Sequence, residues 1–336
     1  MATPYPTSMQ SVYLDLLSRH LDQRVNELGG TPLLREIKGK RYWYTQIAIK
    51  GHKVQRYLGP DSDEMRERIG RARSAVEDQK SARSANRALV RQLESMGAPR
   101  LDRNTGSLLR AMAAVGVFRL GGTRVGTHDY RLYALELGVK LSGLFEATQD
   151  VDIASFERLS LAIEDKVDPS LVQSLHSLNM EPAPALDPAR PTKWITKGGG
   201  PDIEFLAPSF TEEEGPIRLD ALEGWAHGFH YLNYLIAEPI DAVALYLDGV
   251  LVQIPRPERY AIHKLIVAQR RKRSDRAKAR KDLDQARDLI EALSVDRYDD
   301  LKDAYETAAA IGPKWRQAIA KSFERRPDIK NLLSFA

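Results

Sequence analysis

Two aspartates one residue apart, Asp150 and Asp152, lie in the apolar segment QDVDIAS at 149–155. This segment is typical of a β-strand, in which side chains two positions apart point to the same face. Two like charges buried there without a partner would cost several kcal/mol. A divalent cation removes that cost, and a site with oxygen ligands alone suits Mg²⁺ or Mn²⁺. We therefore expect Asp150 and Asp152 to lie on a strand of a sheet and to bind metal.

Glycines and a third carboxylate flank this strand in the sequence. The segment GVFRL at 116–120 is predicted as a short strand ending in Gly121 and Gly122, with a helix directly after it over 123–137. Glycines let a ligand approach the backbone, and a helix N-terminus offers free N–H groups and a positive dipole end that suit a phosphate. Glu204 lies in another apolar strand, DIEFLAP at 202–208, which we expect beside the Asp150–Asp152 strand.

The chain divides into three predicted parts, at 1–100, 101–255 and 256–336. The first part contains an amphipathic helix over 9–28 and short antiparallel strands within 33–58, and polar helices follow within 62–97. The middle part holds the glycine pair and the acids. The last part is helical. The predicted fold class is α+β: a mixed sheet with flanking helices, a helical C-terminal domain and a small N-terminal β-hairpin unit.

The remaining elements follow from local patterns. A helix is expected over 107–115, and Asp248-Gly249 is a hairpin turn signal. Further strands are expected at 193–197, 240–247 and 250–254, and the C-terminal helices at about 258–273, 275–293, 297–309 and 313–325.

Composition restricts the class of protein. Of the 336 residues, 43% are hydrophobic and 29% are charged, which is typical of a globular protein. The absence of cysteine excludes disulfides, thiolate zinc sites and a cysteine nucleophile. No apolar run approaches the roughly 18–20 residues of a membrane span, and the start MATPYPTSMQ lacks the pattern of a signal peptide. We therefore expect a cytoplasmic protein with no membrane partner.

The order of these features resembles the polymerase-β-like nucleotidyltransferase superfamily. Its members combine a glycine pair at a helix start, an Asp-x-Asp strand and a third acid on a neighbouring strand. The sequence is most similar to bacterial nucleotidyltransferase-like proteins of the AbiEii abortive-infection toxin and GSLT type. In those proteins a threonine, here Thr148, precedes the acids, and a later helix carries Lys and Arg. The resemblance covers residues 105–290.

The resemblance implies transfer of a nucleotide from an NTP to a hydroxyl group with two metal ions, Mg²⁺ or Mn²⁺. It implies that Asp150 and Asp152 bind one ion each, and that Glu204 helps to bind the first ion and acts as a base. The family more often has aspartate as the third acid, so Asp202 stays open as the alternative.

The resemblance also implies a set of NTP ligands. Gly121 and Gly122 would hold the phosphates, with Thr123 in place of the polar residue that often follows the first glycine. Lys264 and Arg271 would reach the triphosphate from the segment HKLIVAQRR. The spacing between Gly122 and Asp150 is 27 residues, which agrees with family members whose intervening helix is long rather than with the compact ones.

Basic and aromatic residues indicate the acceptor. Residues 270–281 contain eight basic side chains and one acid, while the net charge of the whole chain is only +4. The strands within 33–58 carry Tyr42, Trp43 and Tyr44 among lysines and arginines. Aromatic rings can stack on bases while basic side chains follow phosphates. The alternative is that Tyr42 and Tyr44 pack inward under the helix at 9–28 while Trp43 faces out. RNA, such as tRNA, is the first expected acceptor and a protein hydroxyl the second.

Two other classes of function stay open. One is a non-catalytic nucleic-acid-binding protein on a decayed transferase fold, and the other is a toxin whose activity an antitoxin partner masks. His227 and His230 have a spacing seen in zinc sites, but core packing is the preferred interpretation because no third ligand is near in sequence. His128 either contacts a phosphate or packs.

Overall fold

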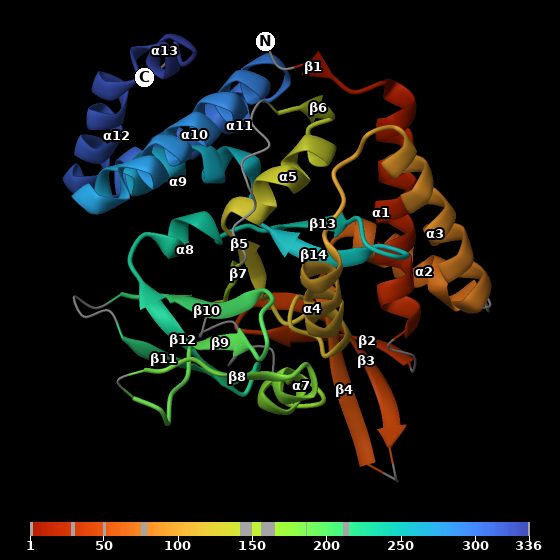
Figure 1. The fold of residues 1–336 in the computed structure, drawn as a ribbon. Helices are drawn as coiled ribbons and strands as arrows, with labels where there is room; N and C mark the ends of the chain where they lie inside the picture. Colours follow the sequence, from red (N-terminus) through yellow and green to blue (C-terminus); the bar gives the residue numbers. More distant parts are fainter. Residues whose placement is uncertain are drawn as a thin grey trace.

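The structure is a computed structural model that describes residues 3–27, 31–49, 52–74, 79–141, 150–155, 165–185, 187–210 and 215–334. Over these residues the fold is α+β, with a mixed sheet and flanking helices, as predicted. Figure 1 shows the C-terminal helices gathered at one end of the molecule and a ribbon of N-terminal strands projecting at the opposite end.

The N-terminal unit combines helices with an antiparallel ribbon. Its elements are β1 (Thr3–Pro4), α1 (Thr7–Glu27), β2 (Thr31–Ile37), β3 (Lys40–Ile49), β4 (His52–Pro60), α2 (Asp63–Ser74) and α3 (Gln79–Ser95). The turn between β2 and β3 passes through Gly39, whose φ of +73° is a conformation that glycine adopts at no steric cost. α1 packs against α3 through an apolar cluster that includes Met9, Tyr13, Leu16, Val90 and Leu93.

The aromatic residues of this ribbon are used for packing. Tyr44 and Tyr57 are buried in the main core, with their rings 5.6 Å apart and edge to face. Tyr42 is half-buried and packs against the same core. Trp43 packs against α2, and its indole N–H donates a hydrogen bond to Asp61 at 2.9 Å. The tyrosines therefore pack inward, but in the main core and not in the apolar cluster of α1, and the expectation that Trp43 faces out is wrong.

Over the described residues, nine strands form the central sheet. They are β5 (Thr123–Val125), β7 (Asp150–Ala154), β8 (Met180–Pro182), β9 (Lys193–Thr196), β10 (Asp202–Pro208), β11 (Pro216–Leu219), β12 (Gly224–Phe229), β13 (Ile240–Ala244) and β14 (Val250–Ile254). The main path runs β11-β12-β10-β7-β5-β14-β13, and β9 pairs with β10 and β8. β7 runs parallel to β10 and antiparallel to β5. A short pair of β1 with β6 (Val139–Lys140) stands apart.

The glycine pair does not end a strand, as the sequence analysis expects, but precedes one. Residues 116–121 form consecutive turns, with hydrogen bonds from Leu120 N to Gly116 O (3.0 Å) and from Gly122 N to Val117 O (2.9 Å). β5 starts only after Gly122, and the helix α5 (Thr127–Glu136) starts later still. The positive φ angles of Gly116 and Gly121, +95° and +89°, bend the chain, so its apolar residues are buried without pairing to the sheet.

Helices lie around the sheet. They are α4 (Arg103–Ala114), α5, α7 (Leu171–Ser177), α8 (Leu232–Leu235), α9 (Pro257–Arg270), α10 (Arg276–Asp296), α11 (Tyr298–Ile311), α12 (Pro313–Arg325) and α13 (Pro327–Asn331). The Asp102 carboxylate caps α4 by accepting from two backbone N–H groups. Proline stands at the start of α9, α12 and α13, where its missing N–H leaves no bond unmade. α9 packs against α10, α11 and α12.

A helix that crosses a membrane must be both long and apolar. No helix within the described ranges meets both requirements.

Candidate active site

Acidic side chains gather on one face of two neighbouring parallel strands. Asp152 of β7 lies directly opposite Glu204 of β10, and Asp150 lies opposite Asp202. In-register residues of parallel strands point to the same face, so Asp152 and Glu204 share one face, together with Asp202 two positions before Glu204. Asp152 and Glu204 are half-buried, while the alternate residues of both strands fill the core on the other face. The structure describes Asp150 by its backbone only.

Asp202, the alternative third acid, has a partner of its own. Its carboxylate lies 3.3 Å from the ammonium of Lys193 on β9. Lys193 pairs in register with Glu204, so it lies on the same face as the acids. Glu204 stands directly beside Asp152, whereas Asp202 stands one pair further along, next to Asp150. The register therefore favours Glu204 as the acid that acts together with Asp152.

A glycine absent from the sequence analysis, Gly126, lies against these acids. Val125 pairs with Asp152, and Gly126 follows Val125 immediately before α5 begins. Its φ of +111° and ψ of −165° form a conformation that only glycine adopts readily. A Cβ added at Gly126 would stand 2.9 Å from Asp152 Oδ2. The glycine at the start of a helix beside the acids is therefore Gly126.

Gly121, Gly122 and Thr123 lie at the opposite end of β5. Thr123 pairs with Ala154, at the end of β7 remote from Asp150. A Cβ added at Gly122 would stand 2.8 Å from the carbonyl oxygen of Val117. Thr123 is almost fully buried. The glycine pair is thus required for packing of the turn, and the structure does not bring it together with the acids. The missed signal is the triplet TRV between glycines, whose β-branched Thr and Val are typical of a strand.

Tyr260 of α9 holds the backbone of Gly126. Its hydroxyl donates a hydrogen bond to the Gly126 carbonyl oxygen at 2.8 Å. Gln285 Oε1 of α10 lies 3.3 Å from the same hydroxyl. Tyr260 is almost fully buried and meets the ring of Tyr133 edge to face, with centroids 5.1 Å apart. The C-terminal helices therefore fix the start of α5, and the sequence analysis missed this role of Tyr260.

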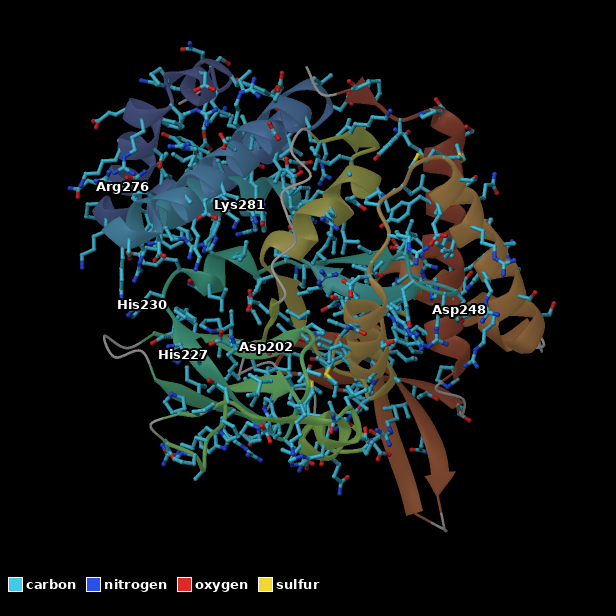
Figure 2. All side chains as sticks on the ribbon, viewed as in Figure 1. Asp202, His227, His230, Asp248, Arg276 and Lys281 are labelled. Carbon is cyan, nitrogen blue, oxygen red and sulfur yellow. The ribbon has the colours of Figure 1, made fainter. Side chains whose placement is uncertain are left out.

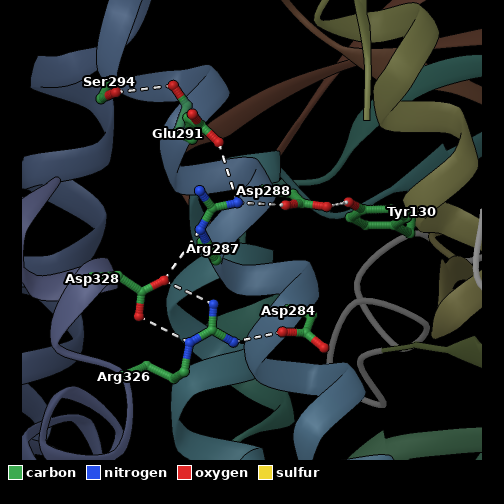
Figure 3. A network of polar contacts seen from close by, with 8 residues as sticks. All are labelled: Tyr130, Asp284, Arg287, Asp288, Glu291, Ser294, Arg326 and Asp328. Carbon is green, nitrogen blue, oxygen red and sulfur yellow. Dashed lines mark hydrogen bonds and ion pairs between the residues drawn. The ribbon is translucent and has the colours of Figure 1, made fainter. Parts of the chain in front are cut away.

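A second set of contacts joins α5 to the C-terminal helices (Figure 3). The hydroxyl of Tyr130 on α5 donates to Asp288 of α10 at 2.8 Å. Arg287 lies 3.4 Å from Asp288 and 3.2 Å from Asp328 of α13. Arg326 donates to both oxygens of Asp328, at 2.9 and 2.8 Å, which holds the pKa of Asp328 below its usual range. A continuous polar network thus runs from α5 to α13.

Lys264 and Arg271 share one carboxylate. Lys264 Nζ donates to Asp282 Oδ1 at 2.7 Å, and Arg271 Nε donates to Asp282 Oδ2 at 2.9 Å. Lys264 and Asp282 are both buried. Burial works to raise the pKa of Asp282, but the two cations hold it below its usual value. Lys264 lies one turn beyond Tyr260, 5.0 Å from its ring centroid, so it is near Gly126 but engaged in a buried ion pair.

The histidines do not form a metal site in the part of the chain that the structure describes. His227 packs on Phe229 with ring centroids 4.7 Å apart, and His230 contacts Tyr231 at 6.5 Å. Among the described side chains, which exclude that of Asp150, no group of three His, Asp or Glu is placed to hold a metal ion. The side chain of His128 and the whole of Thr148 lie outside the described residues.

Paired acids on parallel strands, beside a glycine at a helix start, are typical of the class of protein that binds a phosphorylated ligand together with a cation. Comparison with protein families agrees with this class, because residues 103–310 match the nucleotidyltransferase family. The match covers more than half of the chain, and the chain therefore belongs to this family and is a nucleotidyltransferase. Comparison with curated proteins gives no match.

The two glycine positions are expected to respond differently to alanine. Gly126→Ala pushes a methyl group onto Asp152 and should lower kcat by about a hundredfold, since small misplacements at a reacting centre have large effects. Gly122→Ala crowds Val117 and should lower the free energy of unfolding by about 1–3 kcal/mol while leaving kcat per folded molecule nearly unchanged. Urea denaturation and turnover corrected for the folded fraction check both. Equal losses of kcat in the two variants would contradict the assignment of Gly126.

Proposed function

We propose that this nucleotidyltransferase moves a nucleoside monophosphate from an NTP to a hydroxyl of RNA, using Mg²⁺ or Mn²⁺. The observation that carries the proposal is the in-register pair Asp152 and Glu204, with Gly126 against Asp152. Together with Asp150, these residues correspond to the Asp-x-Asp strand and the third acid on a neighbouring strand that are typical of the polymerase-β-like superfamily, which the sequence resembles. The sequence prediction of a cytoplasmic enzyme forms part of the proposal.

The acids fit a divalent cation by their chemistry. Two carboxylates on adjacent strands of one face repel each other, and hard oxygen ligands are those that Mg²⁺ prefers. Asp150, Asp152 and Glu204 would hold the two proposed ions. When bound, such ions neutralise phosphate charge and make an attacking hydroxyl more acidic.

Gly126 and the start of α5 would bind the phosphates in place of Gly121 and Gly122. The absence of a side chain at Gly126 lets the Asp152 carboxylate approach the backbone, and the N–H groups at the start of α5 favour an anion. Tyr260 positions this backbone by donating a hydrogen bond to the Gly126 carbonyl oxygen. Lys264 acts indirectly, through its contact with the Tyr260 ring, because its ammonium is paired with Asp282.

RNA is the proposed acceptor because of charge on the C-terminal helices. Exposed cations cluster where α9 meets α10: Arg270, Arg271, Lys272, Arg276, Lys278 and Arg280. Figure 2 shows Arg276 at the tip of these helices, on the same flank as His227 and His230. Such a cluster binds phosphates with release of counterions. The N-terminal ribbon of β2, β3 and β4 supports RNA as the acceptor less than its sequence indicates. Its tyrosine rings pack against the main core, and Trp43 packs against α2.

Transfer of label from each α-³²P NTP to total RNA and to protein tests the proposal. We expect labelled RNA with one NTP, only when Mg²⁺ or Mn²⁺ is present, and no label with Asp152→Asn. Labelled protein without labelled RNA would show that the acceptor is a protein hydroxyl, and the proposed nucleotidyl transfer would still stand. No label on either acceptor from the folded wild type with every NTP would overturn the proposed activity.

From the resemblance to AbiEii toxins, we further propose that the protein is a toxin whose nucleotidyl transfer is masked in the cell by an antitoxin partner. Expression of the wild type alone is then expected to arrest growth, while Asp152→Asn is tolerated at the same protein level. Arrest by both variants would separate toxicity from nucleotidyl transfer.

A further inference from the structure

A cavity of about 510 Å³ lies between the N-terminal unit and the central sheet. Its walls come from α1, α3, β4, α4, the turn after α4 and the turn between β13 and β14. This volume is within the range of sites for small ligands, roughly 300–1,000 Å³. The cavity is therefore large enough for a nucleotide-sized molecule.

The cavity is separate from the acids of the candidate active site. It is lined by Gly249, Val250 and Leu251 at the start of β14, which runs parallel to β5 with Gln253 opposite Thr123. It therefore lies at the end of β5 where that strand begins, whereas Asp152 stands opposite Val125, where β5 ends. In Figure 2, Asp248 lies beside α1, on the other flank of the molecule from His227 and His230.

Guanidinium groups dominate the cavity wall. Among the described residues, five arginines line it, against three aspartates: Arg24, Arg56, Arg83, Arg110 and Arg119, and Asp168, Asp241 and Asp248. The lining has two more positive than negative side chains, and Asp165 outside the lining, which pairs with Arg56 and Arg119, offsets part of this excess. Arginine is the side chain whose planar fork matches the oxygens of a phosphate.

Ion pairs hold these guanidinium groups in place around the cavity. Arg24 donates two hydrogen bonds to Asp241, at 3.1 and 3.0 Å, and Arg56 donates to Asp168 at 2.8 Å. Arg110 pairs with Asp248, while 39% of its own side chain stays exposed. A guanidinium has five N–H donors, so one carboxylate leaves donors for a further oxygen ligand. The pairs thus orient the arginines before any ligand binds.

The turn that carries Asp248 is held in a strained conformation. Leu247 has a φ of +56°, which is rare for a bulky side chain. His20 Nε2 lies 2.9 Å from the carbonyl oxygen of Asp248, and a Cβ added at Gly249 would stand 2.4 Å from the same nitrogen. Backbone strain of this kind persists at ligand sites, where surrounding contacts enforce it. Close packing against α1 is what fixes Asp248, and with it Arg110, at the cavity.

We propose that this arginine-lined cavity binds a phosphate-bearing ligand of about nucleotide size, at a site distinct from Asp152 and Glu204. The ligand is either a free nucleotide or polyphosphate, or the phosphorylated end of an RNA chain, since both present the same oxygens. The proposal does not depend on the proposed acceptor.

Isothermal titration without divalent ions, in EDTA, tests the site. The probes are inorganic tripolyphosphate, ATP, GTP, and a short RNA with and without a 5′-phosphate. We expect binding by the wild type and equally by Asp152→Asn, since the acids are not involved. The double variant Arg83→Gln/Arg110→Gln should weaken binding by about tenfold or more. Arg110→Lys, which keeps the charge next to Asp248 but not the planar fork, should give a smaller loss and guards against misfolding.

Arg87→Gln is the matched control, because Arg87 is an exposed arginine one turn beyond Arg83 on α3 and does not line the cavity. It should change the Kd by less than about twofold. Tripolyphosphate and nucleotide binding identifies a small ligand, and binding only of the 5′-phosphorylated RNA identifies a nucleic-acid end. The proposal is overturned if the wild type binds no probe, if Arg87→Gln weakens binding as much as the double variant, or if Asp152→Asn abolishes it.

Discussion

Asp152→Asn and Glu204→Gln are each expected to lower kcat for nucleotidyl transfer by about a thousandfold or more. Each change keeps the size of the side chain and removes one of two carboxylates that stand side by side on β7 and β10. Steady-state transfer from the preferred NTP, at saturating Mg²⁺, measures the loss. Asp202→Asn is the matched control, since Asp202 lies on the same strand and face but pairs with Lys193. It should keep kcat within about fivefold, as expected for a partly exposed ion pair.

A readout of metal binding separates this role from a structural one. Mg²⁺ should raise the Tm of the wild type, because a ligand of the folded state stabilises it, and should not raise that of the two variants. A greater loss of kcat in Asp202→Asn than in Glu204→Gln would make Asp202 the third acid. Transfer above about a tenth of wild type in Asp152→Asn would refute the proposed metal site.

Asp282→Ala is expected to lower the free energy of unfolding by about 3–5 kcal/mol, because it leaves the ammonium of Lys264 buried without a counter-charge. Replacing both groups, as in Lys264→Met/Asp282→Leu, should restore most of that loss. Urea denaturation measures both. The exposed pair of Lys302 and Glu306 on α11, 3.8 Å apart, is the control, and Glu306→Ala should cost less than about 0.5 kcal/mol.

The same pair gives a pH dependence of defined sign. The pKa of Asp282 is lower in the folded protein than its ordinary value of 3.8, so the folded state binds its proton less readily than the unfolded state. The contribution of the pair to stability is therefore complete above pH 3.8 and is lost as the pH falls through the lowered folded pKa. An acid titration of stability that is identical in wild type and in Lys264→Met/Asp282→Leu would contradict this coupling.

Local patterns in the sequence predict part of this fold closely. β10 and α12 have the predicted bounds, and the alternation of DIEFLAP places Glu204 on the face that Asp152 shares. The bounds of these two segments are predicted correctly because each segment has one regular hydrophobic period and clear residues at its ends. The prediction of a strand for GVFRL is wrong because its apolar residues are buried in consecutive turns. The positive φ angles of Gly116 and Gly121 permit these turns.

The face that Asp152 and Glu204 share follows from the sequence, whereas the place of Gly126 beside Asp152 and the ion pair of Lys264 do not. The two-residue spacing fixes the face of Asp152 without knowledge of the fold. The choice of Gly126 over Gly121 and Gly122 depends on which end of β5 meets Asp152, and this is a property of antiparallel register that only the folded chain has. The burial of Lys264 follows likewise from the packing of α9 on α10, which brings Asp282 to it from 18 positions away.

The hydrogen bond from Tyr260 to Gly126 has a consequence for cutting the enzyme into parts. A fragment ending at Pro255 would retain Asp150, Asp152 and Glu204 and all described strands of the central sheet. It would lose the Tyr260 hydroxyl that fixes Gly126 and the Asp288 carboxylate that anchors Tyr130. The family match, which runs to residue 310, likewise extends past α10. The smallest fragment worth expressing as an autonomous catalyst therefore includes α9 and α10, and a protein that pulled these helices away would switch the enzyme off without touching its acids.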